Sequence, residues 1–141
     1  MIVSRYTCKG ANISPPISWT GVRPTAKEVV ITVRTIIGGL LAAGSRSEVD
    51  WSVANISPSI EHVDAGQVPP GAVVGRNRLG QEGYSLCPPS KARVVLVTIA
   101  VDAFPRKLGL HQGYDPALIR KAFEHKGTQW GSVLGNVVPH T

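Results

Sequence analysis

Asp50 is the residue whose type and position most suggest chemistry. It stands between Val49 and Trp51 in a segment of alternating polar and apolar residues. A strand carboxylate can simply point into solvent, but one that points inward needs a hydrogen-bonding partner or a raised pKa, and either would mark a site. The natural partners are Arg34 and Arg93, which lie at the ends of apolar segments. An inward Asp50 could act as a general acid or base, or orient Arg93.

Tyr84 is a second polar side chain that could reach the same end of the strands. It comes shortly before Cys87, which precedes Pro88 and Pro89. Its hydroxyl, or the guanidinium of Arg93, could polarise a carbonyl group of a bound molecule. Such a mechanism needs neither a metal nor a cofactor.

Conventional catalytic and metal-binding motifs are missing from the sequence. The 4 histidines stand in unrelated contexts without metal-ligand spacing, and the Gly-Ser pairs lack the flanking glycines of a nucleophile elbow. Residues 75–80 are rich in glycine and arginine, but no helical pattern follows them, as a phosphate-binding loop requires. We therefore expect no metal site and no cofactor.

The composition predicts a single domain over residues 1–141 with a basic surface. The 15 glycines and 11 prolines favour many turns and short strands. A net charge of +6 could attract nucleic acid or anionic lipid, but the basic residues are scattered and no aromatic residues are interleaved with them. We therefore expect no nucleic-acid partner. The oligomeric state stays open, with a homodimer as one option.

The N-terminal residues and the cysteines give information about the cellular location of the protein. The first residues lack the apolar core of a signal peptide, and no apolar run reaches the roughly 18 residues of a membrane span. We therefore expect a cytoplasmic protein without a membrane span. Cys8 and Cys87 could form a disulfide, but two buried free thiols are the preferred interpretation for a cytosolic protein.

The elements that would position these side chains are mostly strands. β-Branched residues predict a strand over 28–34, and an almost continuous apolar run predicts one buried on both faces over 93–101. Alternation predicts a further strand over 49–56. That alternation places Asp50 on the face opposite Trp51.

The rest of the chain is less regular. A double glycine in 36–44 leaves a helical turn, a loop and a strand open there. The Gly- and Pro-rich segment 57–89 predicts a functional or well-packed loop, with a short strand at 72–75. An Asp-Pro pair begins a predicted helix at about 115–126, and 130–138 is predicted to form a closing strand.

Two Pro-Pro pairs carry a resemblance to a known family. The first lies within 12–19, which ends in a tryptophan, and the second closes the segment 83–89. With the strand around Trp51 and the segment 100–103, they make the chain similar to the phosphatidylethanolamine-binding protein family in its shorter bacterial and archaeal form, over nearly the whole chain. The resemblance implies a mainly β fold, a β-sandwich of two sheets with one or few short helices. It also implies that a short N-terminal segment of the family is absent.

The chain departs from the family at the anion pocket. That pocket uses an Asp-Pro-Asp motif, a histidine before the central tryptophan, and a His-Arg-Tyr run. In this chain the corresponding positions are residues 35–37, Asp50 and residues 92–94. Of the family's polar residues at these positions, only the arginine, Arg93, remains. The pocket should therefore be largely apolar, which favours a small apolar or amphipathic molecule over a phosphate head group. We expect the ligand to contact Thr35, Ile37, Asp50, Trp51, Tyr84, Pro88, Pro89 and Arg93.

These residues leave several functions open. The favoured one is a small-molecule-binding protein, because no acid-base pair is established. The alternative is a cofactor-independent enzyme of specialised metabolism, a cyclase or isomerase that uses Asp50, Tyr84 and Arg93 to act on an apolar substrate held in a reactive conformation. Further alternatives are a regulator that binds another protein and a family member whose pocket has no function. An Asp50 side chain in bulk solvent would exclude catalysis.

Overall fold

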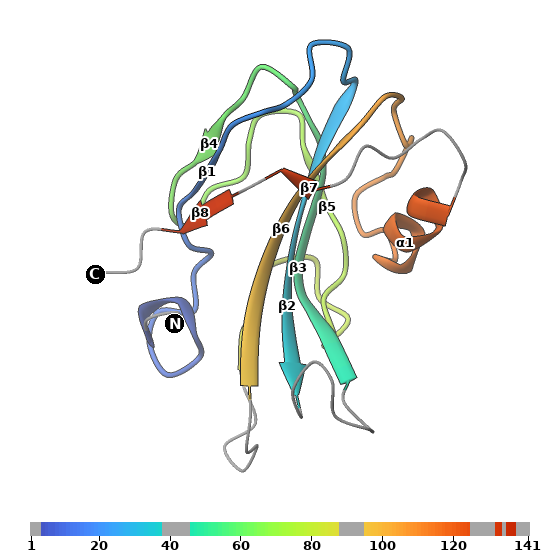
Figure 1. The fold of residues 1–141 in the computed structure, drawn as a ribbon. Helices are drawn as coiled ribbons and strands as arrows, with labels where there is room; N and C mark the ends of the chain where they lie inside the picture. Colours follow the sequence, from blue (N-terminus) through green and yellow to red (C-terminus); the bar gives the residue numbers. More distant parts are fainter. Residues whose placement is uncertain (1–3, 38–45, 88–94, 125–131, 134, 138–141) are drawn as a thin grey trace.

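Two antiparallel sheets pack against each other in the computed structural model of this chain, which describes residues 4–37, 46–87, 95–124, 132–133 and 135–137. The large sheet has the strand order β5-β3-β2-β6-β7, and the small sheet has the order β4-β1-β8 (Figure 1). The elements are η1 (Ser4–Tyr6), β1 (Ile17–Trp19), β2 (Glu28–Ile37), β3 (Arg46–Ile56), β4 (His62–Val63), β5 (Val73–Val74), β6 (Val95–Phe104), α1 (Ala117–Glu124), β7 (Ser132–Val133) and β8 (Gly135–Val137).

The three long strands confirm the strands predicted from β-branched and alternating residues. β2 and β3 extend beyond the predicted bounds, and β2 reaches Ile37, so the start of the ambiguous segment is strand. The remainder of that segment lies outside the described residues. The prediction that β6 is buried on both faces is wrong for its first half: Leu96 is exposed and 97–100 are half-buried. Along the edge of β6 that faces away from β2, β6 pairs with β7 only at Val101 and Asp102.

The shorter elements also follow the sequence in part. A two-residue β5 lies within the predicted strand 72–75, and α1 lies within the predicted helix 115–126. The single closing strand predicted over 130–138 is wrong. Two short strands stand there instead: β7 pairs with β6 in the large sheet, and β8 pairs with β1 in the small sheet.

The core lies between the two sheets, and the first Pro-Pro segment closes it. Pro15 is buried, and β1 then points Ile17 and Trp19 inward while Ser18 faces outward. On the large sheet, alternate residues of β2 and the side chain of Trp51 face the same core. We call this side of the large sheet the inner face.

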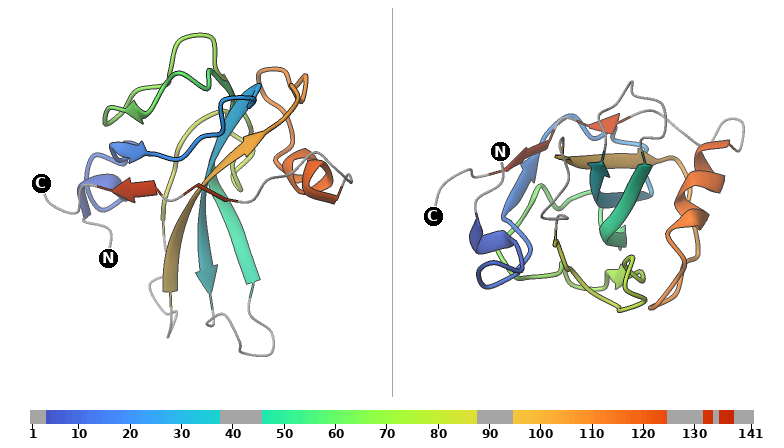
Figure 2. Two further views of the ribbon diagram at one scale, coloured as in Figure 1. Left: turned by 45° about the horizontal axis from the view of Figure 1, so that its top comes forward. Right: turned by 90° about the horizontal axis from the view of Figure 1, so that it is seen from below.

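The opposite side of the large sheet carries α1, and we call it the helix face. Figure 2 shows α1 and the small sheet on opposite sides of the three long strands. Ile119 and Ala122 of α1 pack there against Val30, Ala54 and further apolar side chains. The helix begins as predicted, because Asp115 Oδ1 accepts a hydrogen bond from the Ala117 backbone N–H at 2.9 Å.

Cys8 and Cys87 form a disulfide, so the preferred interpretation of two free thiols is wrong. The N-terminal segment runs beside the loop before the second Pro-Pro pair: Cys8 N donates to Leu86 O at 2.9 Å, and Leu86 N donates to Asn12 Oδ1 at 3.0 Å. These bonds bring the two Cα atoms to 5.2 Å, across a separation of 79 residues. Cross-linking a loop of that length stabilises a fold by about 4.5 kcal/mol in the chain-entropy treatment.

No helix among the described residues is long and apolar enough to cross a membrane.

Candidate functional site

A β-bulge in β3 sets the direction of Asp50. Val33 of β2 pairs with Trp51, but the next residue, Arg34, pairs with Val49. Asp50 is therefore an extra residue without a partner position on β2. A bulge bends the strand and turns the side chain at the extra position, and bulges are frequent beside functional sites.

The bulge directs Asp50 toward Thr35, whose hydroxyl donates a hydrogen bond to Asp50 Oδ2 at 2.6 Å. Thr35 follows Val33 by two residues in β2, on the side of the strand that faces the core containing Trp51. The prediction that Asp50 lies on the face opposite Trp51 is therefore wrong, because it assumed unbroken alternation along β3.

Asp50 is fully buried, with 0% of its surface exposed, which excludes the solvent-facing alternative. Burial raises the pKa of its carboxyl to about 6, against the opposing effects of the Thr35 hydrogen bond and the positive charge of Arg78. The negative charge of Glu48 raises this pKa further. A carboxyl group with a pKa this near neutrality can exchange a proton at physiological pH, which an ordinary aspartate does not do.

Arg78 is the cation that forms an ion pair with Asp50. Its Nε lies 3.6 Å from Asp50 Oδ1, its Nη1 lies 3.9 Å from Glu48 Oε2, and its Nη2 donates to Cys87 O at 2.9 Å. A separation of 3.6 Å is an ion pair rather than a hydrogen bond. Asp50 Oδ1 accordingly has no hydrogen-bond partner among the described residues.

The cations predicted to pair with Asp50 lie elsewhere or outside the described residues. Arg34 lies across the sheet on the helix face, because it pairs with Val49 rather than with the bulged residue. Arg93 lies outside the described residues. The sequence does not single out Arg78, because the segment 75–80 lacks the helical pattern that follows a phosphate-binding loop and its arginines count among the scattered basic residues. The available signal was the presence of arginines in a tight, glycine-bounded turn.

A buried asparagine holds the turn that presents Arg78. Asn77 Oδ1 accepts hydrogen bonds from the backbone N–H groups of Leu79 and Gln81, at 2.9 and 3.2 Å. Arg78 N in turn donates to Val49 O at 2.9 Å. The turn is thus tied to β3 directly beside the bulge, which fixes the start of the Arg78 side chain.

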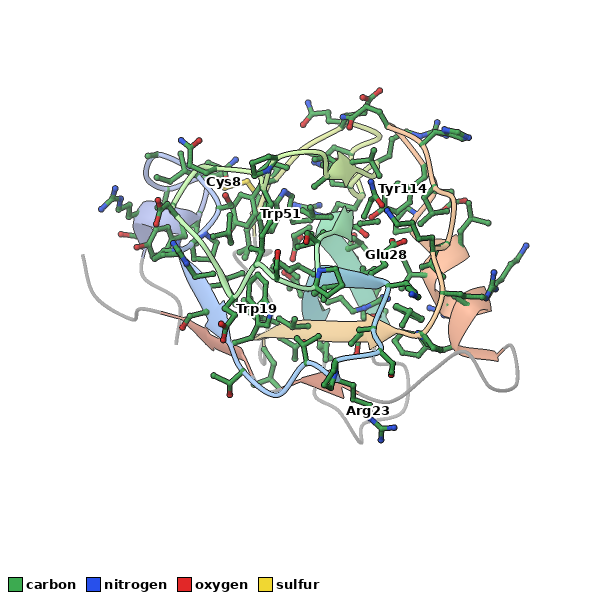
Figure 3. The ribbon with its side chains drawn as sticks, turned by 90° about the horizontal axis from the view of Figure 1, so that it is seen from above. Cys8, Trp19, Arg23, Glu28, Trp51 and Tyr114 are labelled. Carbon is green, nitrogen blue, oxygen red and sulfur yellow. A yellow bond between two sulfur atoms is a disulfide. The ribbon has the colours of Figure 1, made fainter. Side chains whose placement is uncertain are left out.

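Tyr84 and Trp51 form the apolar wall of the site. Their ring centroids lie 5.9 Å apart in an edge-to-face arrangement. The Tyr84 hydroxyl donates to Tyr6 O at 2.6 Å, and burial, with the nearby charge of Asp50, raises the pKa of this hydroxyl. Tyr84 therefore keeps its proton and commits it to a backbone carbonyl. Figure 3 shows Trp51 and Trp19 on the side of Cys8, and Tyr114 on the side of α1.

The structure brings together four of the eight predicted site residues: Thr35, Asp50, Trp51 and Tyr84. Ile37 is half-buried at the end of β2, two residues beyond Thr35. Pro88, Pro89 and Arg93 lie outside the described residues. No group of three or more metal-ligating side chains occurs in the described part of the chain.

A groove of about 510 Å³ lies on the helix face and contains none of the eight predicted residues. Four arginines, namely Arg34, Arg76, Arg78 and Arg120, line it together with the start of α1. Of these, Arg78 also belongs to the Asp50 site.

Comparison with known proteins agrees with this architecture. A family model described as phosphatidylethanolamine-binding protein matches residues 1–138. A UPF0098 protein of Methanothermobacter thermautotrophicus is 44% identical over 95 residues, covering 63% of this chain and 60% of the relative. The UPF0098 protein PH1269 of Pyrococcus horikoshii is 30% identical over 141 residues, covering 95% of this chain and 69% of the relative.

Two solved structures share the fold. The PEBP homologue CT736 of Chlamydia trachomatis superposes with a TM-score of 0.74 at 25% identity, covering 99% of this chain and 89% of the other. Escherichia coli YbcL superposes with a TM-score of 0.73 at 23% identity, covering 99% and 88%. These likenesses confirm the predicted two-sheet, mainly β architecture. In sequence, the chain spans 60%, 50% and 40% of the lengths of the first curated relatives that it matches.

Proposed function

Because the chain belongs to the phosphatidylethanolamine-binding protein family, we propose that it binds a small molecule at the inner-face site around Asp50. The observation that carries the proposal is the half-satisfied carboxylate of Asp50. One oxygen accepts from Thr35, and the other is buried without a hydrogen-bond partner among the described residues. Leaving a buried acceptor unsatisfied costs about 1 to 3 kcal/mol, and a ligand N–H or O–H group would recover that free energy.

The surroundings favour a largely apolar ligand with one such donor. Trp51 and Tyr84 supply aromatic surface, and the Tyr84 hydroxyl is already committed to Tyr6. The histidine and tyrosine donors of the family's anion pocket are replaced in this chain, so we expect a ligand that differs from the family's phospholipid. We therefore propose an apolar or amphipathic molecule whose donor group meets Asp50 Oδ1.

The pKa of Asp50 favours a second candidate, a cofactor-independent cyclase or isomerase. With a pKa of about 6, this carboxyl can both give and take a proton near neutral pH. Asp50 would then act as the general acid or base, and the apolar wall would hold the substrate in a reactive conformation.

A fluorescent probe with the proposed chemistry tests binding. N-phenylnaphthylamine has two apolar ring systems and one N–H donor, and its fluorescence rises when it leaves water. We expect the wild-type protein to bind it and Asp50→Asn to bind about tenfold more weakly, because a charged acceptor is replaced by a neutral one. Glu48→Gln is the matched control: it removes a carboxylate that also pairs with Arg78 but lies at the partly exposed end of the cluster.

Each outcome decides between the candidates. Equal binding by Asp50→Asn and the wild type, or loss in Glu48→Gln of the same size, contradicts the role of Asp50 as anchor. An enzyme would bind its substrate in both variants and lose turnover only in Asp50→Asn. A carrier would show no turnover in any of them.

The disulfide gives evidence about the cellular compartment in which the protein resides. Disulfides persist mainly in oxidising compartments, so the Cys8–Cys87 bond weighs against the cytoplasmic location predicted from the sequence. A Mycobacterium tuberculosis relative, 33% identical over 88 residues, is named as a candidate lipoprotein, LppC. We propose an oxidising compartment for this chain. Thiol alkylation of the protein in intact cells, followed by mass spectrometry, should then label neither cysteine.

A further inference from the structure

The groove on the helix face concentrates four positive charges from three separate parts of the chain. Arg34 comes from β2, Arg76 and Arg78 from the turn after β5, and Arg120 from α1. The lining includes a single carboxylate, that of Asp115. Residues this far apart in sequence meet here only through the fold, which is why the sequence showed nothing but scattered basic residues.

The positive charges in the groove repel each other. Burial lowers the pKa of the Arg34 guanidinium, the positive charge of Arg120 lowers it further, and the buried carboxylate of Asp102 acts in the opposite direction. Asp115 is the one carboxylate in the lining, and it also accepts a hydrogen bond from the Ala117 backbone N–H at the start of α1. A bound anion would relieve the repulsion between Arg34 and Arg120.

Two of the arginines are held in place before any ligand arrives. Arg76 Nε donates to Gly113 O at 2.8 Å, and Arg76 N donates to Tyr114 O at 2.9 Å. Arg78 is held by Val49 O and Cys87 O. Fixing a guanidinium beforehand reduces the conformational entropy that is lost on binding.

We propose that this groove binds a small molecule that carries at least two anionic groups, carboxylates or phosphates. Guanidinium groups match both chemistries through paired N–H donors. A groove of about 510 Å³ is the size of a small-molecule site, and its lining includes no aromatic residue on which a nucleic-acid base could stack. The two sites share Arg78, but Arg34 and Arg120 belong to the groove and not to the inner-face site, so substitutions of these two test the groove independently.

Calorimetric titration with citrate and with pyrophosphate at low salt tests the proposal. We expect the wild-type protein to bind at least one of them, and Arg34→Gln and Arg120→Gln each to weaken that binding by about tenfold or more. The matched control is Lys121→Gln, which removes the same charge from the next, exposed position of α1, outside the groove lining. It should bind as the wild type does. Melting temperatures establish that each variant is folded.

The two titrants and the control separate the explanations. Preference for citrate identifies a polycarboxylate ligand, and preference for pyrophosphate identifies a phosphorylated one. The proposal is overturned if neither anion binds, or if Lys121→Gln loses as much affinity as Arg120→Gln, because that result indicates a diffuse charge effect. Sedimentation with phosphatidylserine vesicles in the absence of binding to either small anion would also overturn it, in favour of a membrane surface.

Discussion

The candidate sites on the two faces of the large sheet are centred on opposite charges in opposite settings. On the inner face the carboxyl group of Asp50 is buried beside aromatic rings. On the helix face, four arginines surround an open groove. A buried carboxyl changes its protonation near neutral pH, whereas guanidinium groups stay charged throughout. One sheet thus separates a site suited to proton exchange and hydrogen bonding from a site suited to ion pairing.

Arg78 links the two faces around the edge of β3. The edge strand β5 has two residues and pairs with β3 only at Val53 and Ala54. The backbone carbonyl of Val49 is thereby left for Arg78 N, and the Arg78 side chain lines the groove while approaching Asp50. A longer β5 would occupy this edge and separate the two sites completely.

A second buried carboxylate sharpens the contrast. Glu28 is 1% exposed, and its two oxygens accept from the backbone N–H groups of Asn55 and Leu108 at 2.8 and 2.9 Å. Glu28 is therefore satisfied on both oxygens, whereas Asp50 is satisfied on one. The first arrangement is typical of a structural carboxylate, and the second leaves an acceptor for something else.

The largest effect is expected from Glu28→Ala, which leaves two part-buried backbone donors without this acceptor. At about 1 to 3 kcal/mol for each lost partner, the free energy of unfolding should fall by about 3 kcal/mol. Urea denaturation followed by tryptophan fluorescence measures it. The control Glu61→Gln, at an exposed position, should change little. An unchanged midpoint in Glu28→Ala would show that Glu28 is no more structural than Asp50.

Asp50→Asn should act in the opposite direction at neutral pH. The folded-state pKa of about 6 lies above the ordinary value of 3.8, so the native state binds more protons between these values. Wild-type stability therefore falls as pH rises through this window, by about 2 to 3 kcal/mol from this group alone, and the loss is complete above the folded-state pKa. Asparagine does not ionise, so the variant should be the more stable protein at about pH 7.5 and similar to the wild type at about pH 4.

Urea denaturation of both proteins at the two pH values measures this difference. A variant that is less stable than the wild type at both would show that the carboxylate of Asp50 is fully paired in the native state. The contrast with Glu28 would then disappear.

The fold and half of the inner-face site could be predicted from the sequence for identifiable reasons. The Pro-Pro segments, the β-branched strands and the central tryptophan are local patterns, and they carried the family resemblance. The orientation of Asp50 was missed because one extra residue in β3 becomes visible only when the register with β2 is known. The Cys8–Cys87 disulfide was an open alternative, but free thiols were preferred because a cytoplasmic location was expected. The arginine groove was missed because it joins residues whose proximity the fold alone creates.

The smallest predicted effect tests how separate the two faces are. Arg78 lowers the pKa of Asp50 through its positive charge, so Arg78→Gln should raise that pKa above about 6, by less than about one unit because the guanidinium is partly exposed to water. Arg34→Gln removes the same charge from the groove but lies across the sheet from Asp50, and it should leave this pKa unchanged. Carbon NMR of the Asp50 carboxyl through a pH titration measures both shifts. Equal shifts in the two variants would mean that the sheet does not insulate the inner face from the groove, and Arg78 would lose its distinct place between them.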